Sequence, residues 1–268
     1  MKGHAMTDVF VHPDRRPAKF RPLTAWAHMQ QLIADKEDTE QVFHIIEALN
    51  GRSFEKNFHA FAESEKGREQ LARKEYLPPM LDDHEWIRAL PDGTVGRAYV
   101  DFMEREGLTA QGLVDESEKF QGSVRDFDDD YNWFGNRLRD THDLFHVLSG
   151  YGRDALGEAS LLAFTYSQNP GLGVIFISYM GCRQILKSVP KEARIMDCFW
   201  EGKRNGAAAA RIVREDIIAL LHAPLDAARA RLNIAKPVAY RHALDVCAKK
   251  GLVADQIALN PSPVQAAA

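Results

Sequence analysis

Apolar residues recur at intervals of three and four along most of the chain, which is the spacing of one buried face of an α-helix. Two runs show this pattern most clearly: Val42, Ile45, Ile46 and Leu49, and then Phe54, Phe58 and Phe61. No stretch alternates apolar and polar residues in the manner of a β-strand. The pattern therefore predicts an all-α protein, a single-domain helical bundle, because no linker is long enough to force two domains.

Capping and breaking residues set the expected helix ends. We predict helices over residues 24–34, 38–51, 63–74, 94–107, 207–221, 226–232 and 237–249. Asp38 with Gln41 is a capping pair, while Gly51 and Gly107 are typical of helix C-termini. The chain is divided into an extended N-terminal arm over residues 1–21, a helical domain over residues 22–259 and a disordered tail over residues 260–268.

Charged, apolar and histidine residues at several places in the chain lead to further predictions. The acidic run from Asp126 to Asp130 is typical of a solvated loop, and the almost wholly apolar segment from Val174 to Leu186 predicts a fully buried central helix. Arg137 and Arg139 are placed either to reach a substrate carboxylate or phosphate or to pair with the acidic run. Three further histidines have no clustered partners in the sequence and are expected to be edge or core residues, not ligands: His28, His44 and His59.

Candidate chemistry gathers between Arg139 and Glu158. On a helix, His142, Asp143 and His146 fall within about 100° of one another on one face. Two imidazoles four residues apart can present two nitrogens to one metal ion. Asp143, three residues before His146, suits direct coordination of the same ion. The alternative is a histidine pair without metal and an exposed Asp143.

Glu158 joins this group only if the chain turns back. It lies twelve residues past His146, which is about 18 Å along a continuous helix at about 1.5 Å per residue. The glycines Gly150 and Gly152 supply the turn, because glycine takes the positive φ that closes a helix. Apolar residues flank the polar ones, and a buried carboxylate needs a partner. The sequence predicts a metal site on an antiparallel helical hairpin; a solvated Glu158 is the alternative.

The motif His142-Asp143-x-x-His146, followed by eleven residues and Glu158, resembles the signature of the fourth Coq protein family of ubiquinone (coenzyme Q) biosynthesis. The resemblance extends to Gly51, to the segment from Glu65 to Arg68 and to the segment from Leu90 to Phe102, and covers about residues 22–232. It implies a polyprenylated hydroxybenzoate-type substrate, whose C1 carboxyl group is lost and replaced by hydroxyl.

We hypothesise that His142, Asp143, His146 and Glu158 hold one divalent metal ion, with zinc as the first choice and Fe, Mn or Co also suited. The metal would bind the ring head and promote C1 decarboxylation with hydroxylation, as in an oxidative decarboxylase, while residues 174–186 form a wall for the polyprenyl tail. The alternative function is a non-catalytic scaffold that binds lipid and quinone intermediates. A metal-dependent phosphohydrolase is disfavoured, since those enzymes need further upstream His and downstream Asp ligands.

Composition narrows the class of protein. Of 268 residues, 45% are hydrophobic and 27% charged, which is ordinary for a globular protein. A net charge of −4 disfavours nucleic acid. Three cysteines without metal spacing are expected to be core residues: Cys182, Cys198 and Cys247. No apolar run reaches the length of about 20 residues that spans a bilayer.

These features favour a cytoplasmic protein. Peripheral contact with the inner face of the membrane is compatible with the sequence. The expected partners are the polyprenylated aromatic substrate and other ubiquinone-biosynthesis proteins, and a homodimer is compatible with the sequence.

Overall fold

The computed structural model describes residues 9–16, 19–35, 38, 40–119 and 127–252. Over these residues the chain forms α-helices and two short 3-10 helices, and it contains no strand. An isolated backbone bridge joins Thr94 to Pro224. The prediction of an all-α, single-domain protein is confirmed for the described part of the chain.

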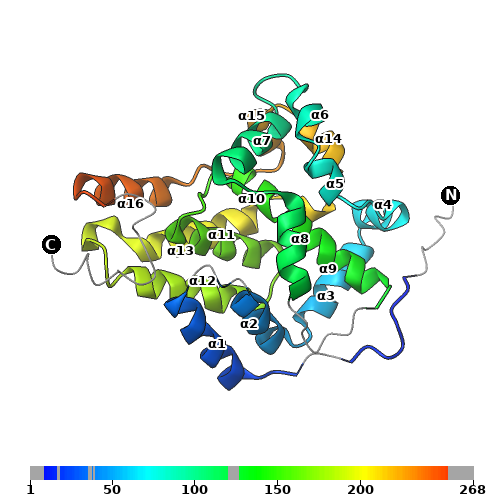
Figure 1. Ribbon diagram of the computed structural model, residues 1–268, viewed down its shortest axis with the longest axis horizontal. Helices are drawn as coiled ribbons and strands as arrows, with labels where there is room; N and C mark the ends of the chain where they lie inside the picture. Colours follow the sequence, from blue (N-terminus) through cyan, green and yellow to red (C-terminus); the bar gives the residue numbers. More distant parts are fainter. Residues whose placement is uncertain (1–8, 17–18, 36–37, 39, 120–126, 253–268) are drawn as a thin grey trace.

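The longest helices gather around α11 (Ala155–Gln168), as Figure 1 shows. α11 packs against both α12 (Leu172–Ile185) and α13 (Ile195–Ala208), and α16 (Val238–Lys249) packs against α13. α11 has few exposed residues and carries apolar side chains around much of its circumference. Such a helix is stable only in the interior of a bundle.

Two glycines of α13 bring it unusually close to α11. A Cβ atom at Gly202 would lie 2.3 Å from the carbonyl oxygen of Ser160, and one at Gly206 would lie 2.2 Å from that of Phe164. Both positions therefore require glycine. The close contact fixes the position of the helix that carries Glu158.

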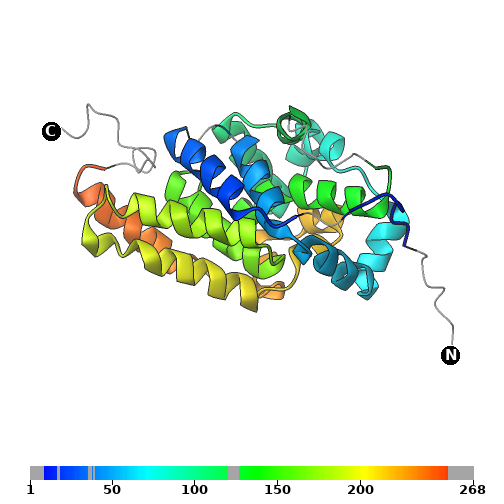
Figure 2. The ribbon, with the colours of Figure 1, turned by 90° about the horizontal axis from the view of Figure 1, so that it is seen from below.

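A helical pair covers α12 from the outside. α1 (Pro22–Ala34) and α2 (Glu40–Asn50) lie against each other and against α12, as Figure 2 shows from below. Their shared core contains Met29 and Ile45 together with Ile177 of α12. The pair thus forms an outer layer on the bundle.

A second group of helices gathers around α7 (Val95–Glu106), which packs against α10 (His142–Ser149). Three more helices contact α7: α6 (His84–Arg88), α14 (Ile217–His222) and α15 (Leu225–Arg231). The remaining elements are α3 (Ser53–Ala62), α4 (Glu65–Arg73), α5 (Pro78–Leu81), α8 (Ala110–Lys119), α9 (Asp130–Asp140) and the 3-10 helices η1 (Lys191–Ala193) and η2 (Ile212–Arg214). One hydrophobic core joins the α7 group to α11, with Phe102, Leu144 and Phe164 among its residues.

Most predicted helix ends are confirmed to within a few residues. Thr94 accepts a hydrogen bond from the backbone nitrogen of Arg97 at 3.3 Å, and Gly107 ends α7 with φ +66°. Gln41, in the first turn of α2, donates to the carboxylate of Asp38, which precedes the helix, at 2.9 Å. Local capping chemistry therefore determines these boundaries.

The predicted helix over residues 207–221 is wrong. α13 begins at Ile195 and ends at Ala208, and the chain then passes through η2 before α14 begins at Ile217. Gln168 of α11 captures the backbone in between, because its amide donates to the carbonyl of Ala209 and accepts from the nitrogen of Ile212. Tertiary hydrogen bonds thus outweigh the helical propensity of this segment.

The predicted fully buried helix over residues 174–186 is also corrected. Ile177, Cys182 and Ile185 of α12 are buried, but Leu172 and Tyr179 are 52% and 42% exposed. One face of this apolar helix therefore remains uncovered by the rest of the described chain.

The prediction of a solvated loop from Asp126 to Asp130 is wrong for the last two residues of the run. Asp126 lies outside the described residues. Asp129 and Asp130 are buried, and each binds the N-terminal arm. Asp129 also caps α9 by accepting from the nitrogen of Asn132 at 2.9 Å. The acidic residues of this segment hold the arm to the bundle.

The structure also tests the predictions for the isolated histidines and the cysteines. His28 and His44 are not isolated, since their rings stack with centroids 4.3 Å apart. The cysteines at positions 182, 198 and 247 are buried, as predicted, and they form no disulfide. The predicted disordered tail, residues 260–268, lies outside the described residues.

Candidate metal centre

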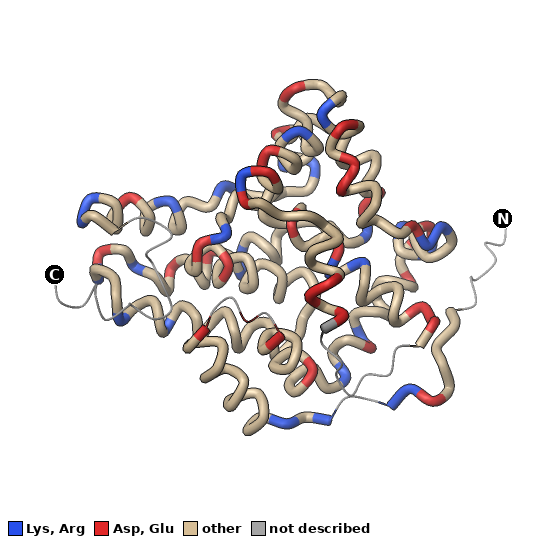
Figure 3. Tube along the Cα trace, in the orientation of Figure 1, with Lys and Arg blue, Asp and Glu red and all other residues tan. Residues whose placement is uncertain are grey.

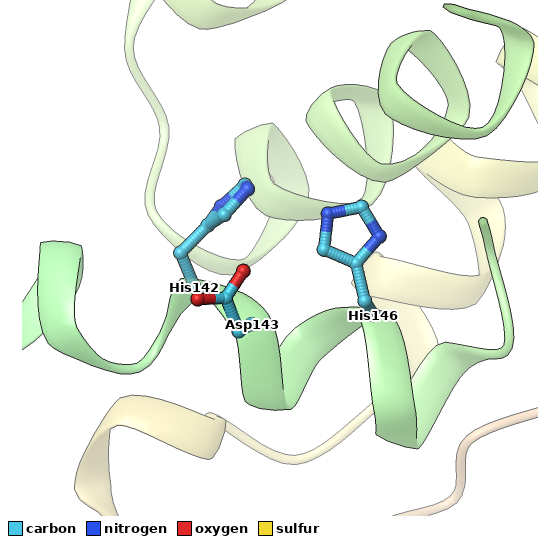
Figure 4. Close-up of side chains that lie close together, drawn as sticks. All are labelled: His142, Asp143 and His146. Carbon is cyan, nitrogen blue, oxygen red and sulfur yellow. The ribbon is translucent and has the colours of Figure 1, made fainter. Parts of the chain in front are cut away.

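Three of the four predicted ligands project from α10. His142, Asp143 and His146 each offer one ligand atom, and these atoms lie within 4.8 Å of one another. Figure 4 shows the three side chains rising from the same side of the helix. The two imidazole rings meet edge to face, with centroids 5.0 Å apart. The spacing read from the sequence therefore produces a compact group of donors.

His146 is held by a stacked aromatic ring and by a hydrogen bond at one nitrogen. Its Nδ1 lies 3.0 Å from the carbonyl oxygen of Tyr151, which can only accept, so Nδ1 carries the hydrogen in that bond. Phe102 stacks on the ring at 5.3 Å between centroids. Nε2 is buried and makes no hydrogen bond of good geometry, although a Glu158 oxygen lies 3.3 Å away. A buried nitrogen without a partner is costly unless a ligand occupies it.

Glu158 lies against both imidazoles, although it is not part of the compact group on α10. Its Oε1 is 3.3 Å from Nε2 of His146, and its Oε2 is 3.9 Å from Nε2 of His142. α10 ends at Gly150, which has φ +77°, and α11 begins after the N-cap Asp154. The turn between the two helices thus brings Glu158 to the histidines, as the sequence predicted.

The charges of the site shift the pKa values of its groups. Burial acts to lower the pKa of His146, but the Glu158 carboxylate outweighs it and raises the pKa above its usual value. Burial, together with neighbouring His146, lowers the pKa of His142. The pKa of Glu158 is lowered because His146 and His142 outweigh the opposing effect of burial. At neutral pH, Glu158 is therefore an anion beside a largely neutral His142.

The site is closed on one side and open on the other. The His146 side chain has no exposed surface, whereas those of His142 and Glu158 are 29% and 33% exposed. Arg153 stands at the open side, with its Nε 3.8 Å from Glu158 Oε1 and its side chain 35% exposed. A ligand can therefore approach past His142 and Glu158 and meet a positive charge there.

The two arginines considered for substrate binding are used elsewhere. Arg137 is buried and donates to the carbonyl oxygens of Val213 and Glu215. Arg139 binds Asp140 and Ser117. Neither arginine pairs with residues 127–130, the described part of the acidic run. Contact of either arginine with a substrate stays a prediction.

Sequence reasoning missed Arg153, Phe102 and the carbonyl of Tyr151. Arg153 was detectable, since it follows the turn glycines directly and precedes Glu158 by five residues. The stacking of Phe102 on His146 joins residues far apart in the chain, so local spacing carries no signal of it.

Charges of both signs occur on most elements, and Figure 3 shows no broad stripe of one sign in this view.

An all-helical fold with a His-Asp-x-x-His donor group beside a glutamate defines a class of candidate metal proteins. The chain belongs to the family described as "Coenzyme Q (ubiquinone) biosynthesis protein Coq4", which it matches over residues 21–238. The family resemblance seen in the sequence is confirmed, and the family is named for ubiquinone biosynthesis.

Fungal relatives show the same relationship. A protein of Ajellomyces capsulatus (strain NAm1 / WU24), named "Ubiquinone biosynthesis protein COQ4, mitochondrial", is 28% identical over 200 residues, which are 72% of this chain and 66% of the relative. A Neurospora crassa protein, named "Ubiquinone biosynthesis protein coq-4, mitochondrial", is 30% identical over 148 residues, or 55% of this chain and 40% of the relative. The matched stretches thus cover no more than about two thirds of either relative.

A solved structure shares the fold. It comes from Nostoc punctiforme PCC 73102, is named for ubiquinone biosynthesis, and has a TM-score of 0.58 at 20% sequence identity. The superposition covers 80% of this chain and 98% of the other. Among the described residues, no helix combines the length and apolar character needed to cross a membrane.

Proposed function

We propose that His142, Asp143, His146 and Glu158 bind one divalent metal ion at the turn between α10 and α11, and that this site acts in ubiquinone biosynthesis. The observation that carries the proposal is Nε2 of His146, which is buried, makes no hydrogen bond of good geometry and lies 3.3 Å from a Glu158 oxygen. When His146 is neutral, the bond from Nδ1 to Tyr151 leaves a lone pair on Nε2. A metal ion satisfies that lone pair and the carboxylate together.

The donor set suits zinc first. Two neutral imidazoles and two carboxylates balance the charge of a divalent cation, and zinc accepts nitrogen and oxygen donors. Fe, Mn and Co suit the same donors. The exposed surface of His142 and Glu158 leaves an approach for substrate. Bound metal would supply Lewis acidity to a carboxylate or phenolate oxygen of the substrate.

The proposed substrate is a polyprenylated hydroxybenzoate-type compound. Its anionic head would meet Arg153 at the open side of the site. Replacing the C1 carboxyl group by hydroxyl breaks the bond from the ring to the carboxyl carbon, forms a ring–oxygen bond and releases carbon dioxide. The ring loses two electrons, so the reaction requires water as the source of the hydroxyl oxygen and a two-electron acceptor, for example dioxygen reduced to hydrogen peroxide.

An apolar groove supports the presence of a lipid tail. The groove has a volume of about 420 Å³ and is lined by the exposed face of α12, by residues of α13 and by Phe20 and Leu49. Its exposed members include Leu172, Tyr179 and Trp200. The opposite face of α12 contacts α11 beside Glu158, because Ser178 donates to the carbonyl of Ala159. One helix thus contacts both the groove and the Glu158 segment.

The same groove favours the alternative function. A protein that holds prenylated intermediates for other ubiquinone-biosynthesis proteins also needs an apolar surface, and in that case the metal would only stabilise the turn. Those partners, a homodimer and a cytoplasmic location with peripheral membrane contact remain predictions.

Release of carbon dioxide distinguishes the two functions. Purified protein loaded with zinc, iron, manganese or cobalt is incubated in air, with and without a soluble quinone as two-electron acceptor, together with a polyprenylated hydroxybenzoate labelled at the C1 carboxyl group. Wild type and the surface control Tyr76→Phe should release label, whereas His142→Ala should not. If wild type binds the compound but releases no label with any of these metals, the catalytic proposal is wrong and the scaffold is favoured.

A further inference from the structure

The peptide group between Tyr151 and Gly152 is held at both ends. Its carbonyl oxygen accepts from Nδ1 of His146 at 3.0 Å, and its N–H donates to the hydroxyl of Tyr240 at 3.1 Å. A peptide group is planar and rigid. The Tyr240 hydroxyl, on α16, therefore sets the direction of the carbonyl that orients His146.

The same hydroxyl is tied to the helix that carries Glu158. It donates to one carboxylate oxygen of Asp154. The other oxygen of Asp154 accepts from the backbone nitrogens of Leu156 and Gly157 at 3.2 and 3.1 Å, which caps α11. Glu158 lies in the first turn of that helix. One hydroxyl thus joins the His146 side of the site to the Glu158 side.

Contacts of the backbone and ring of Tyr240 hold its hydroxyl at the turn. Glu201 accepts from the backbone nitrogens of Ala239 and Tyr240, which anchors the start of α16. The ring of Tyr240 packs edge to face on Tyr151, with centroids 5.6 Å apart. At Gly152, a Cβ atom would lie only 2.6 Å from the hydroxyl oxygen. The contact therefore depends on glycine at that position and on a buried tyrosine.

We infer that Tyr240 is a positioning residue, which holds His146 in the tautomer with hydrogen on Nδ1 and a bare Nε2 turned to the metal. The inference rests on the proposed metal-binding function. The stretch that matches the family ends at residue 238, and Tyr240 lies two residues beyond it. Tyr240 therefore contributes to the site from outside that stretch. Without the hydroxyl, the Tyr151 carbonyl loses its anchor and the hydrogen can move to Nε2, which then cannot bind metal.

The test uses Tyr240→Phe, which removes the hydroxyl and keeps the ring. Two controls accompany it: Tyr76→Phe removes an exposed hydroxyl, and Ser64→Ala removes the N-cap of α4 and so lowers stability far from the site. Nitrogen-15 NMR of the His146 ring in metal-free protein, at a pH above the pKa of His146, reports the tautomer. Titration with Zn²⁺ against a competing chelator gives the dissociation constant.

We expect the Nδ1–H tautomer in wild type and both controls, and a mixture of tautomers in Tyr240→Phe. The dissociation constant for Zn²⁺ should rise about tenfold or more in Tyr240→Phe alone. An unchanged ring spectrum in a folded Tyr240→Phe protein overturns the inference, as does a zinc affinity equal to that of Ser64→Ala. If wild type binds no Zn²⁺, the proposed function fails, while the NMR comparison still decides the role of Tyr240.

Discussion

The N-terminal arm should be held less firmly in acid, because the buried carboxylate of Asp129 makes several of its contacts. Asp129 accepts two hydrogen bonds from Arg15, at 2.5 and 2.6 Å, and one from the backbone nitrogen of His12 at 2.9 Å. Burial acts to raise the pKa of Asp129, but these donors and Asn132 outweigh it and lower the pKa to about 2, from 3.8. The folded protein therefore binds the Asp129 proton more weakly than the unfolded chain does.

That difference in pKa corresponds to a free energy. A shift of this size is worth about 2 kcal/mol, which solvent around the arm reduces to about 1–2 kcal/mol. Because the folded pKa is the lower one, the stabilisation is complete above the unfolded pKa of Asp129. It is lost as the pH falls towards about 2.

The substitution Asp129→Asn isolates this charge. Asparagine caps a helix about as well as aspartate, so the N-cap of α9 is retained. We expect the free energy of unfolding of the variant, measured by urea denaturation at neutral pH, to be about 1–2 kcal/mol lower than that of wild type. The difference should shrink as the pH is lowered below 4 or so, towards the folded pKa. A difference that stays constant between neutral pH and about pH 3 would refute the reasoning.

Two further substitutions test the packing and the electrostatics of the site. Gly206→Ala places a methyl group against the Phe164 carbonyl of α11 and should cost about 1–3 kcal/mol in urea denaturation. The control Gly135→Ala, in α9, should cost little, because a Cβ atom there would meet nothing closer than 3.6 Å. Glu158→Gln removes the carboxylate that raises the pKa of His146, so an NMR titration of the metal-free variant should show a lower pKa for His146 than in wild type. An unchanged pKa would contradict the assigned contact.

Local chemistry explains what the sequence made predictable. The spacing of His142 and His146 on one helix requires nothing beyond α-helical geometry, and Gly150 marks the turn because its φ of +77° favours glycine. Helix ends such as Thr94 and Gly107 were found for the same reason. In each of these cases the determining atoms lie within a few residues of one another.

The errors arise where distant residues decide the outcome. The helix expected over residues 207–221 is interrupted because Gln168 binds its backbone from another helix. Asp129 is buried because Arg15, more than a hundred residues earlier, reaches it. The role inferred for Tyr240 depends on a hydroxyl that meets the turn from α16. No local pattern reveals these contacts.

Metal content tests the central claim most directly. Purified protein and the double variant His142→Ala, His146→Ala are analysed for metal after reconstitution with zinc and removal of excess ion. The account predicts close to one zinc per wild-type chain and none retained by the variant, with both proteins folded by circular dichroism. Wild-type protein that retains no metal after reconstitution, or a variant that retains as much as wild type, would contradict the metal site.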